Sequence, residues 1–255
     1  MIARIKALIP NKIKSAIKKL FHGIRPPRIK LTRFIPSGCS FEITSEMEKY
    51  RVTSCGEEAD TIEKVLAEIK PGDMFYDIGS CVGLYALHAA LLGCHVIAFE
   101  PDPAYRKRLK RNIKINRLGK KVQVLDWAVS DKPDEVTLYT DGVEGNSPSL
   151  RQVGSRGSVT VRTDTIDNAI KMGKIPTPTI IKLDIEGAEI LALQGMKNLL
   201  ASQNSPRFIF IEYHPDFLPD YGSSFEQCKA LVESCGYKEI YSLQRANQNH
   251  YFYKR

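Results

Sequence analysis

The chain has 255 residues, of which 43% are hydrophobic and 26% are charged. These fractions are typical of a soluble globular protein and exclude disorder, collagen and coiled coil for most of the chain. The formal net charge of +8 points at first to a nucleic-acid partner, but residues 1–41 contain ten Lys and Arg residues and no acid. Subtracting those ten charges leaves −2 on the other 214 residues. The sequence therefore predicts a near-neutral body with a basic arm.

Residues 1–25 form this arm. Apolar residues recur at helical spacing between Ile2 and Phe21 with lysines among them, and Pro10 is expected to break or kink the helix. A basic amphipathic helix suits an anionic membrane surface or the groove of a partner. The alternative is that its apolar stripe packs on its own domain or on a second subunit. Peripheral membrane contact and a homo-oligomer are therefore both open.

The cysteines and the hydropathy of the chain indicate where in the cell the protein is expected. No Cys-x-x-Cys pair occurs among the six cysteines, and Cys81 and Cys94 lie in apolar stretches that predict small buried side chains. No run of eighteen apolar residues predicts a membrane span, and the N-terminus lacks the uninterrupted apolar core of a signal peptide. We expect a reducing, cytoplasmic location, with the inner face of the membrane as a site for the arm.

The expected elements follow in chain order. Residues 26–56 are expected to be short strands that lead into a main domain of residues 57–255, in which a helix ends at Pro71-Gly72. Further strands are expected at residues 74–78, 95–100, 122–126, 179–184 and 208–213. Further helices are expected at residues 82–92, 103–115, 188–200 and 225–235.

Two strand pairs complete this pattern. Residues 136–139 and 158–161 are expected to form a hairpin-like insertion around the polar loop 140–157, and residues 237–243 and 251–253 a closing antiparallel pair. Alternating strands and helices predict an α/β fold with a doubly wound, mostly parallel, Rossmann-like sheet that ends in a C-terminal antiparallel strand pair.

In such a sheet, ligands bind at the carboxyl ends of the strands. The first strand ends in Asp77, followed by Gly79, Ser80 and Gly83. This is not the Gly-x-Gly-x-x-Gly pattern of a pyrophosphate site. Glycines let the backbone approach a ligand closely, and a preceding acid suits a ligand that carries an ammonium or sulfonium charge.

The next two strands also end in acids. Glu100 follows Asp77 by 23 positions and can accept hydrogen bonds from both hydroxyls of a ribose. The third strand ends Asp126-Trp127-Ala128, where Asp126 could accept from an adenine amino group and Trp127 offers an apolar wall. Acids at three successive strand ends predict a nucleoside ligand.

The fourth and fifth strand ends carry candidates for chemistry. Asp184, Glu186 and Glu189 lie within six residues after the fourth strand. The two glutamates could instead only cap the following helix, where acids are favoured. His214 follows the fifth strand and could be a general base, an orienting group or a structural histidine.

Together these segments resemble the FkbM family of class I S-adenosylmethionine-dependent methyltransferases. The family fingerprint is a loop like Asp-Ile-Gly-Ala-Asn-x-Gly, then Glu-Pro, then Asp-x-Glu-Gly-x-Glu, then Glu-x-His. The matching segments are Asp77–Gly83, Glu100-Pro101, Lys182–Glu189 and Glu212–His214. Ser80-Cys81 stands where the family commonly has Ala-Asn, so the side-chain contact of that Asn is missing here. The resemblance covers about residues 57–243.

The resemblance implies O-methylation, with S-adenosylmethionine as cofactor, of a hydroxyl on a sugar, glycan, lipid-linked or secondary-metabolite acceptor. Asp184 is the first candidate for the base that removes the hydroxyl proton, followed by Glu186 and His214. The polar loop 140–157 is a candidate substrate lid. The predicted cofactor-binding residues are Asp77, Gly79, Ser80, Gly83, Glu100, Asp126, Trp127 and Ala128. No metal ligand is assigned, although a divalent metal at Asp184 and neighbouring carboxylates could activate the hydroxyl instead.

Two other functions stay open. An RNA methyltransferase acting on exocyclic amines usually carries Asn/Asp-Pro-Pro-aromatic after the fourth strand, and residues 184–187 lack it. Acids there would also repel phosphate, so we expect no nucleic-acid partner. A non-catalytic membrane- or partner-binding protein could keep the nucleoside fold, but the acids at Asp77, Glu100 and Asp184 argue against lost activity. The glycine pattern disfavours a dehydrogenase.

Overall fold

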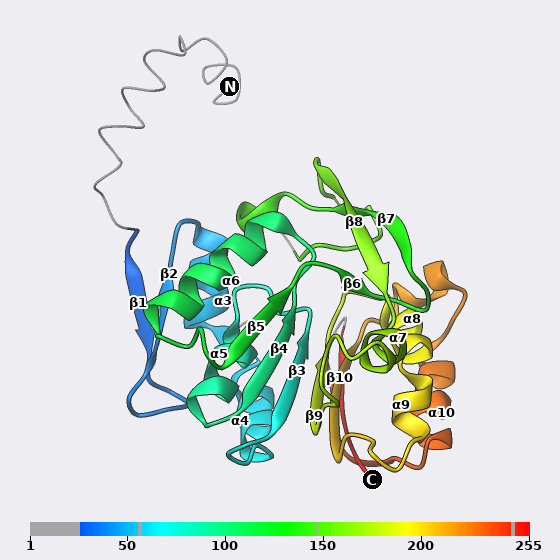
Figure 1. Ribbon diagram of the computed structural model, residues 1–255. Helices are drawn as coiled ribbons and strands as arrows, with labels where there is room; N and C mark the ends of the chain where they lie inside the picture. Colours follow the sequence, from blue (N-terminus) through cyan, green and yellow to red (C-terminus); the bar gives the residue numbers. More distant parts are fainter. Residues whose placement is uncertain (1–25, 56–57, 146, 153, 246–247) are drawn as a thin grey trace.

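The computed structural model describes all of the chain except residues 1–25, 56–57, 146, 153 and 246–247 (Figure 1). The predicted basic arm therefore lies outside the described residues, and its membrane contact stays a prediction. Among the described residues, a seven-stranded sheet is accompanied by a three-stranded and a two-stranded sheet. No helix in this part of the chain is both long enough and apolar enough to cross a membrane.

The seven-stranded sheet confirms the predicted α/β fold. Its strands are β3 (Met74–Ile78), β4 (His95–Phe99), β5 (Val122–Leu125), β9 (Ile180–Leu183), β10 (Phe208–Tyr213), β11 (Lys238–Gln244) and β12 (Asn249–Lys254). They run in the order β11-β12-β10-β9-β3-β4-β5, and β12 is antiparallel to both of its neighbours. Strand order reverses between β3 and β9, so the crevice where such sheets bind ligands opens at their carboxyl ends.

Helices cover both faces of this sheet (Figure 1). They are α4 (Ala59–Ala67), α5 (Leu84–Leu91), α6 (Pro103–Ile115), α7 (Ile166–Lys171), α8 (Glu189–Gly195), α9 (Lys197–Ala201) and α10 (Phe225–Ser234). Successive side chains of a strand point to opposite faces, so Phe75 packs with α4, α5 and α6 while Tyr76 packs with α7 to α10. Two buried apolar layers therefore hold the sheet between them. The predicted helix 188–200 is two helices that meet at Met196.

The lead-in segment differs from the prediction. Residues 26–56 contain β1 (Arg28–Leu31) and β2 (Cys39–Glu42), as expected, but then the helix α3 (Glu46–Thr53) instead of further strands. The hydroxyl of Ser45 accepts a hydrogen bond from the N–H of Glu48 and caps this helix. Glu48 is buried and ion-paired with Arg108 of α6 at 2.5 Å. A tertiary polar contact stabilises the helix, and apolar periodicity does not reveal it.

The hairpin-like insertion is confirmed. Strands β7 (Asp134–Tyr139) and β8 (Ser158–Asp164) are antiparallel, and β6 (Ala128–Val129) joins β8 in parallel. The loop between β7 and β8 contains the short 3-10 helix η3 (Gly142–Glu144), and a second such helix, η4 (Leu218–Tyr221), follows β10. The β7–β8 loop brings Ser147 and Pro148 to the carboxyl edge of the large sheet.

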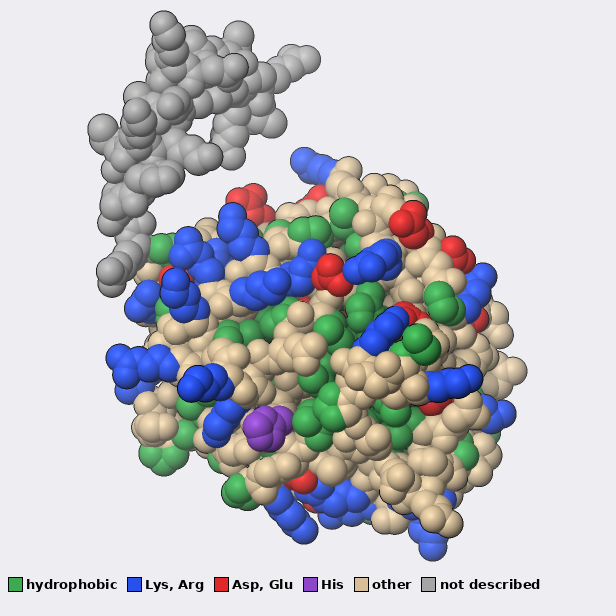
Figure 2. Space-filling view, in the orientation of Figure 1, with side chains coloured by type: hydrophobic (Ala, Val, Ile, Leu, Met, Phe, Trp, Pro, Cys, Tyr) green, Lys and Arg blue, Asp and Glu red, His purple; other side chains and the backbone are tan. Residues whose placement is uncertain are grey.

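The basic charge is not confined to the arm. Figure 2 shows Lys and Arg side chains gathered on the side of the molecule where β1 and α6 lie. The exposed basic residues of α6 and the turn after it are Lys107, Lys110, Arg111, Lys114, Arg117, Lys120 and Lys121. The prediction of a near-neutral body describes the net charge of residues 42–255, but its distribution is asymmetric.

One ion pair ties the starts of three neighbouring strands together. Arg207, just before β10, donates to both carboxylate oxygens of Asp73, just before β3, at 2.7 Å. Thr179, just before β9, donates to the same carboxylate at 3.0 Å. We expect Asp73→Asn to lower the free energy of unfolding by about 2 kcal/mol, because Arg207 loses a charged, bidentate partner in a half-buried setting. Urea denaturation measures the loss.

The pH dependence has a defined sign. Burial raises the pKa of Asp73, but the hydrogen bonds from Arg207 and Lys70 outweigh it, and the net pKa is lowered. The stabilisation is therefore present above the unfolded pKa of about 3.9 and is lost as pH falls through the folded pKa. Asp60→Asn is the matched control, because Asp60 pairs with Arg33 at the exposed surface. Equal losses in both variants would contradict the prediction.

Candidate active site

The β3–α5 loop depends on a glycine. Gly79 has a φ of +84°, and a Cβ added there would lie 1.8 Å from the backbone oxygen of Asp184. Only glycine lets this loop pass so close to the end of β9. The hydroxyl of Ser80 donates to the backbone oxygen of Asp77 at 2.7 Å and closes the turn. Gly83 has a φ of +93°, and a Cβ there would meet Leu87.

A buried lysine, which the sequence reasoning missed, holds this loop to the neighbouring strand. Nζ of Lys182 donates to the backbone oxygen of Gly79 at 2.8 Å. It lies 3.4 Å from Oδ1 of Asp77 and 3.2 Å from Oδ2 of Asp184. Burial lowers the pKa of Lys182, but the two carboxylates outweigh it and the net pKa is raised. The signal in the sequence was a lysine inside an otherwise apolar strand.

Two of the predicted cofactor-binding acids, Asp77 and Asp126, line neither of the two cavities described below. Asp77 is fully buried, accepts a hydrogen bond from the N–H of Ala86 at 3.0 Å and faces Lys182. Burial raises its pKa more than Lys182 lowers it. These contacts join the loop to α5, and the cofactor contact of Asp77 stays a prediction. The half-exposed Asp126 pairs with Arg162 at 3.1 Å, outside both cavities described below.

An apolar cavity lies at the carboxyl ends of β3 and β4. It measures about 710 Å³ including its open mouth, and Gly79, Glu100, Trp127 and Ala128 of the predicted residues line it. Trp127 packs against Phe99 with ring centroids 4.9 Å apart. The remaining walls are mostly aliphatic side chains from several elements: Ile78, Val129, Leu138, Leu150 and Ile185.

Glu100 is the buried acid of this apolar cavity. Its two carboxylate oxygens accept hydrogen bonds from the N–H groups of Cys81, at 2.7 Å, and Asp102, at 2.9 Å. Burial raises the pKa of Glu100 to about 8 despite these bonds. Each oxygen keeps a second lone pair, so the carboxylate can still accept from a ligand.

A polar cavity adjoins the apolar one. Five residues line both: Gly79, Cys81, Ser147, Asp184 and Glu186. Ser80 lines only the polar cavity. The other walls of the polar cavity include residues that the sequence reasoning did not select: Arg51, Glu58, Tyr85, Glu212 and Arg245. The sequence offered a signal only for Glu212, which belongs to the Glu-x-His segment.

Asp184 and Glu186 lie where the two cavities meet. Burial raises the pKa of Asp184, but the positive charges of Lys182 and His214 lower it by more. The net pKa of Asp184 therefore lies below its ordinary value. Asp184 is therefore a carboxylate at neutral pH. Burial raises the pKa of Glu186. Glu186 has a φ of +58°, which is unusual for this residue type and turns its side chain toward His214.

His214 is enclosed by carboxylates. Its Nδ1 bonds to Oε1 of Glu189 at 3.0 Å, and its Nε2 lies 3.4 Å from Glu186 and 3.5 Å from Glu212. Burial lowers the pKa of His214, but the bond with Glu189 and the surrounding charges raise it to about 10. A protonated imidazole has no lone pair, so this geometry favours an orienting role over the predicted role as base. Glu189 therefore does more than occupy the first turn of α8, because it also hydrogen-bonds His214.

All six cysteines are free thiols. Cys94 is buried as predicted, but Cys81 is only partly buried and lines both cavities. Cys81 has a φ of +51°, and its N–H donates to Glu100. The prediction that Cys81 is a small core residue was therefore wrong, because the turn after β3 points it at the site.

When the seven strands are numbered along the chain, their order across the sheet is 3-2-1-4-5-7-6. This order, with a cavity where it reverses, defines the class I methyltransferase architecture. The chain belongs to the FkbM methyltransferase family: the family described as "Methyltransferase FkbM domain" matches residues 77–239. The resemblance seen in the sequence is thereby confirmed.

Known proteins similar to this chain are also methyltransferases. The chain is 30% identical over 205 residues to the hexuronic acid methyltransferase AglP of Haloferax volcanii, covering 80% of each. It is 28% identical over 205 residues to the 31-O-demethyl-FK506 methyltransferase FkbM of Streptomyces tacrolimicus, covering 68% of this chain and 75% of that one. The crystal structure of methyltransferase FkbM from Methylobacillus flagellatus KT shares the fold with a TM-score of 0.50 at 14% identity. That match covers 83% of this chain and 56% of the other.

Proposed function

We propose that this protein is an S-adenosylmethionine-dependent O-methyltransferase whose acceptor is a hydroxyl of a sugar, glycan, lipid-linked molecule or secondary metabolite. The observation that carries the proposal is the pair of adjoining cavities that meet at Asp184 and Glu186. A transfer between two molecules needs two sites with the transferred group at their junction. The acids stand at that junction.

The apolar cavity fits the cofactor. Its walls are mostly apolar with one buried acid, which is the usual character of a small-molecule site, and the β3–α5 loop at Gly79 forms part of them. Trp127 and the aliphatic walls suit a purine, and Glu100 would accept from ribose hydroxyls. When bound, S-adenosylmethionine supplies a methyl group made electrophilic by its sulfonium. The carboxylates of Asp184 and Glu186 suit that positive charge.

The polar cavity suits the acceptor. Its walls offer hydroxyl, carboxylate and guanidinium groups, which hydrogen-bond hydroxyl-rich molecules. AglP is named for a hexuronic acid and FkbM for 31-O-demethyl-FK506, and a further relative, 26% identical over 163 residues, is the 2-O-methyltransferase NoeI of Sinorhizobium fredii. The ionised Asp184 at the junction would repel a phosphate group there, which supports a small-molecule or glycan acceptor over nucleic acid.

The chain's contribution to the reaction is orientation and proton removal. Holding the acceptor oxygen in line with the methyl carbon supplies much of the rate. Asp184, ionised at neutral pH, accepts the proton of the hydroxyl, and Glu186 stands beside it. Lys182 holds Asp184 and His214 holds Glu186 through ion pairs.

Calorimetric titration with S-adenosylmethionine tests the cofactor assignment. We expect Glu100→Ala to weaken binding by up to about 100-fold, because the variant loses a buried acceptor of two ligand hydrogen bonds that contribute roughly 0.5–1.5 kcal/mol each. Glu46→Ala is the control, because the side chain of Glu46 is 90% exposed on α3. Absence of binding to the unaltered protein would remove the methyltransferase proposal.

A further inference from the structure

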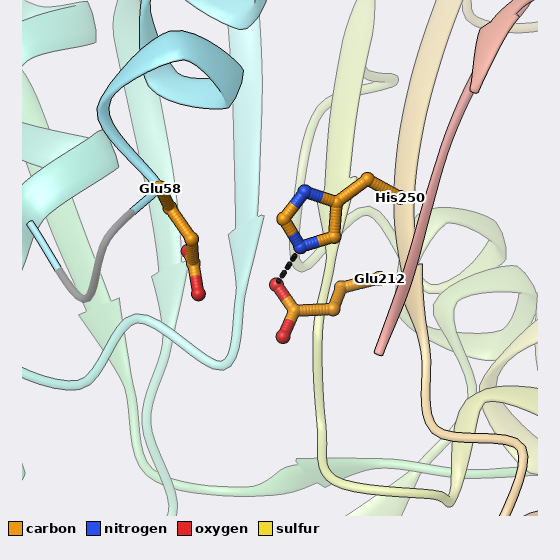
Figure 3. A group of neighbouring side chains, drawn as sticks. All are labelled: Glu58, Glu212 and His250. Atoms are coloured by element: carbon orange, nitrogen blue, oxygen red, sulfur yellow. Dashed lines mark ion pairs between the residues drawn. The ribbon is translucent and has the colours of Figure 1, made fainter. Parts of the chain in front are cut away.

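A second cluster of ligating side chains lies in the wall of the polar cavity, away from His214. Figure 3 shows Glu58, Glu212 and His250, which come from three separate parts of the chain; the His250 ring and the Glu212 carboxylate face each other, and Glu58 lies beside them. One ligand atom from each lies within 4.8 Å of the others. Glu58 and Glu212 line the polar cavity, and His250 is buried behind them.

The imidazole of His250 points its outer nitrogen into this cluster. Its Nδ1 is engaged with the hydroxyl of Thr61 at 2.8 Å. Its Nε2 is buried and has no hydrogen-bond partner of acceptable geometry among the described residues, although Oε2 of Glu212 lies 3.2 Å away as an ion pair. A ring held through one nitrogen, with the other facing carboxylates, is the arrangement that a metal-binding histidine adopts.

A second unsatisfied group faces the same space. Tyr85 is 6% exposed and lines the polar cavity, and its hydroxyl has no hydrogen-bond partner among the described residues. Buried hydroxyls normally have one. A metal ion with bound water or an acceptor oxygen would supply it.

The alternative cluster of Asp184, Glu212 and His214 is less suitable. Nδ1 of His214 is bonded to Glu189, and its Nε2 already faces two carboxylates. Asp184 is held by Lys182. Nδ1 of His250 bonds instead to the uncharged hydroxyl of Thr61, and burial lowers the pKa of His250, so it is the histidine that can offer a lone pair to a cation.

We propose that Glu58, Glu212 and His250 form a binding site for a divalent first-row metal ion such as Mn²⁺ or Zn²⁺. Two carboxylates and one imidazole are a ligand set that these ions accept, with metal–ligand distances of roughly 2.0–2.2 Å. Glu58 precedes α4 and its carboxylate also lies 3.7 Å from Arg245, so it completes the set by turning from Arg245 into the cluster. The open coordination positions face the polar cavity.

The role of this ion rests on the proposed function. An ion in the acceptor wall binds a hydroxyl oxygen of the acceptor next to the one that is methylated, and fixes the orientation of the molecule against Asp184. Adjacent hydroxyls, or a hydroxyl beside a carboxylate, are the acceptor groups that such an ion chelates.

Mn²⁺ binding to the full chain tests the site. The protein is treated with a chelator, dialysed and titrated with Mn²⁺ while the paramagnetic resonance signal of free Mn²⁺ is recorded. We expect one Mn²⁺ per chain, displaced by Zn²⁺. Glu58→Gln should weaken Mn²⁺ affinity by at least about tenfold. Glu63→Gln, an exposed change on the same helix, should leave it unchanged.

Calorimetry with S-adenosylmethionine on the same samples reports folding and separates the two proposals. Absence of Mn²⁺ binding to the unaltered protein, or equal affinity in the two variants, would overturn the metal site even where cofactor binding is normal. Mn²⁺ binding that depends on Glu58 together with no cofactor binding would overturn the proposed methyltransferase and leave the metal site standing.

Discussion

Asp184→Asn is expected to reduce methyl transfer by at least about a hundredfold while cofactor affinity changes little. The amide keeps the size and the hydrogen-bonding oxygen of the side chain but cannot take up the acceptor proton at neutral pH. Asp184 is ionised in the folded protein because Lys182 and His214 outweigh the effect of burial. Single-turnover measurement of methyl transfer, combined with cofactor titration, separates the chemical step from binding.

Two further variants make this result specific. Asp131→Asn changes an exposed aspartate outside both cavities and should retain full activity. Glu186→Gln should lower the rate less than Asp184→Asn, because burial already raises the pKa of Glu186. A larger loss in Glu186→Gln would transfer the role of base to that residue. An Asp184→Asn enzyme with normal turnover would remove Asp184 from it.

The second large effect is expected at Gly79. An alanine Cβ there would lie 1.8 Å from the backbone oxygen of Asp184. A Cβ is fixed by the backbone and the oxygen belongs to the backbone, so neither atom can rotate away. We expect Gly79→Ala to lower the free energy of unfolding by at least about 3 kcal/mol and to abolish S-adenosylmethionine binding. Urea denaturation and calorimetry measure the two effects.

Gly173→Ala is the matched control. Gly173 also has a positive φ, +66°, but a Cβ there would meet nothing within 4 Å. Its cost is therefore the conformational one alone, about 1–2 kcal/mol. If Gly79→Ala were no more destabilising than Gly173→Ala, the close approach between the loop and β9 would not matter to the fold.

Much of the fold was predictable because its signals are local. Strand β3 and helix α6 begin and end at the residues that apolar runs and Pro103 indicate. Helix α3 was not predictable in this way, because its buried face consists partly of Glu48, whose partner Arg108 is 60 positions away. Polar contacts of that range leave no periodic pattern.

The site was predictable in part for the same reason. The ends of β3, β4 and β9 identify Gly79, Glu100 and Asp184, since parallel strands bring their carboxyl ends to one edge. Burial could not be read from these motifs, so the sequence did not distinguish Asp77, which faces Lys182, from Glu100, which lines the cavity. Glu58 and His250 reach the site from the two ends of the domain, and only the tertiary structure brings them together.

The wall between the two cavities contains an ammonium group. Nζ of Lys182 donates to the backbone of the β3–α5 loop at Gly79, which lines the apolar cavity, and pairs with the carboxylate of Asp184, which lines both cavities. A ligand that shifts the loop changes the field at Asp184, and a ligand that engages Asp184 changes the hold on the loop. Such coupling is reciprocal in free energy, and Lys182 is the side chain that connects the proposed cofactor site with the proposed acceptor site.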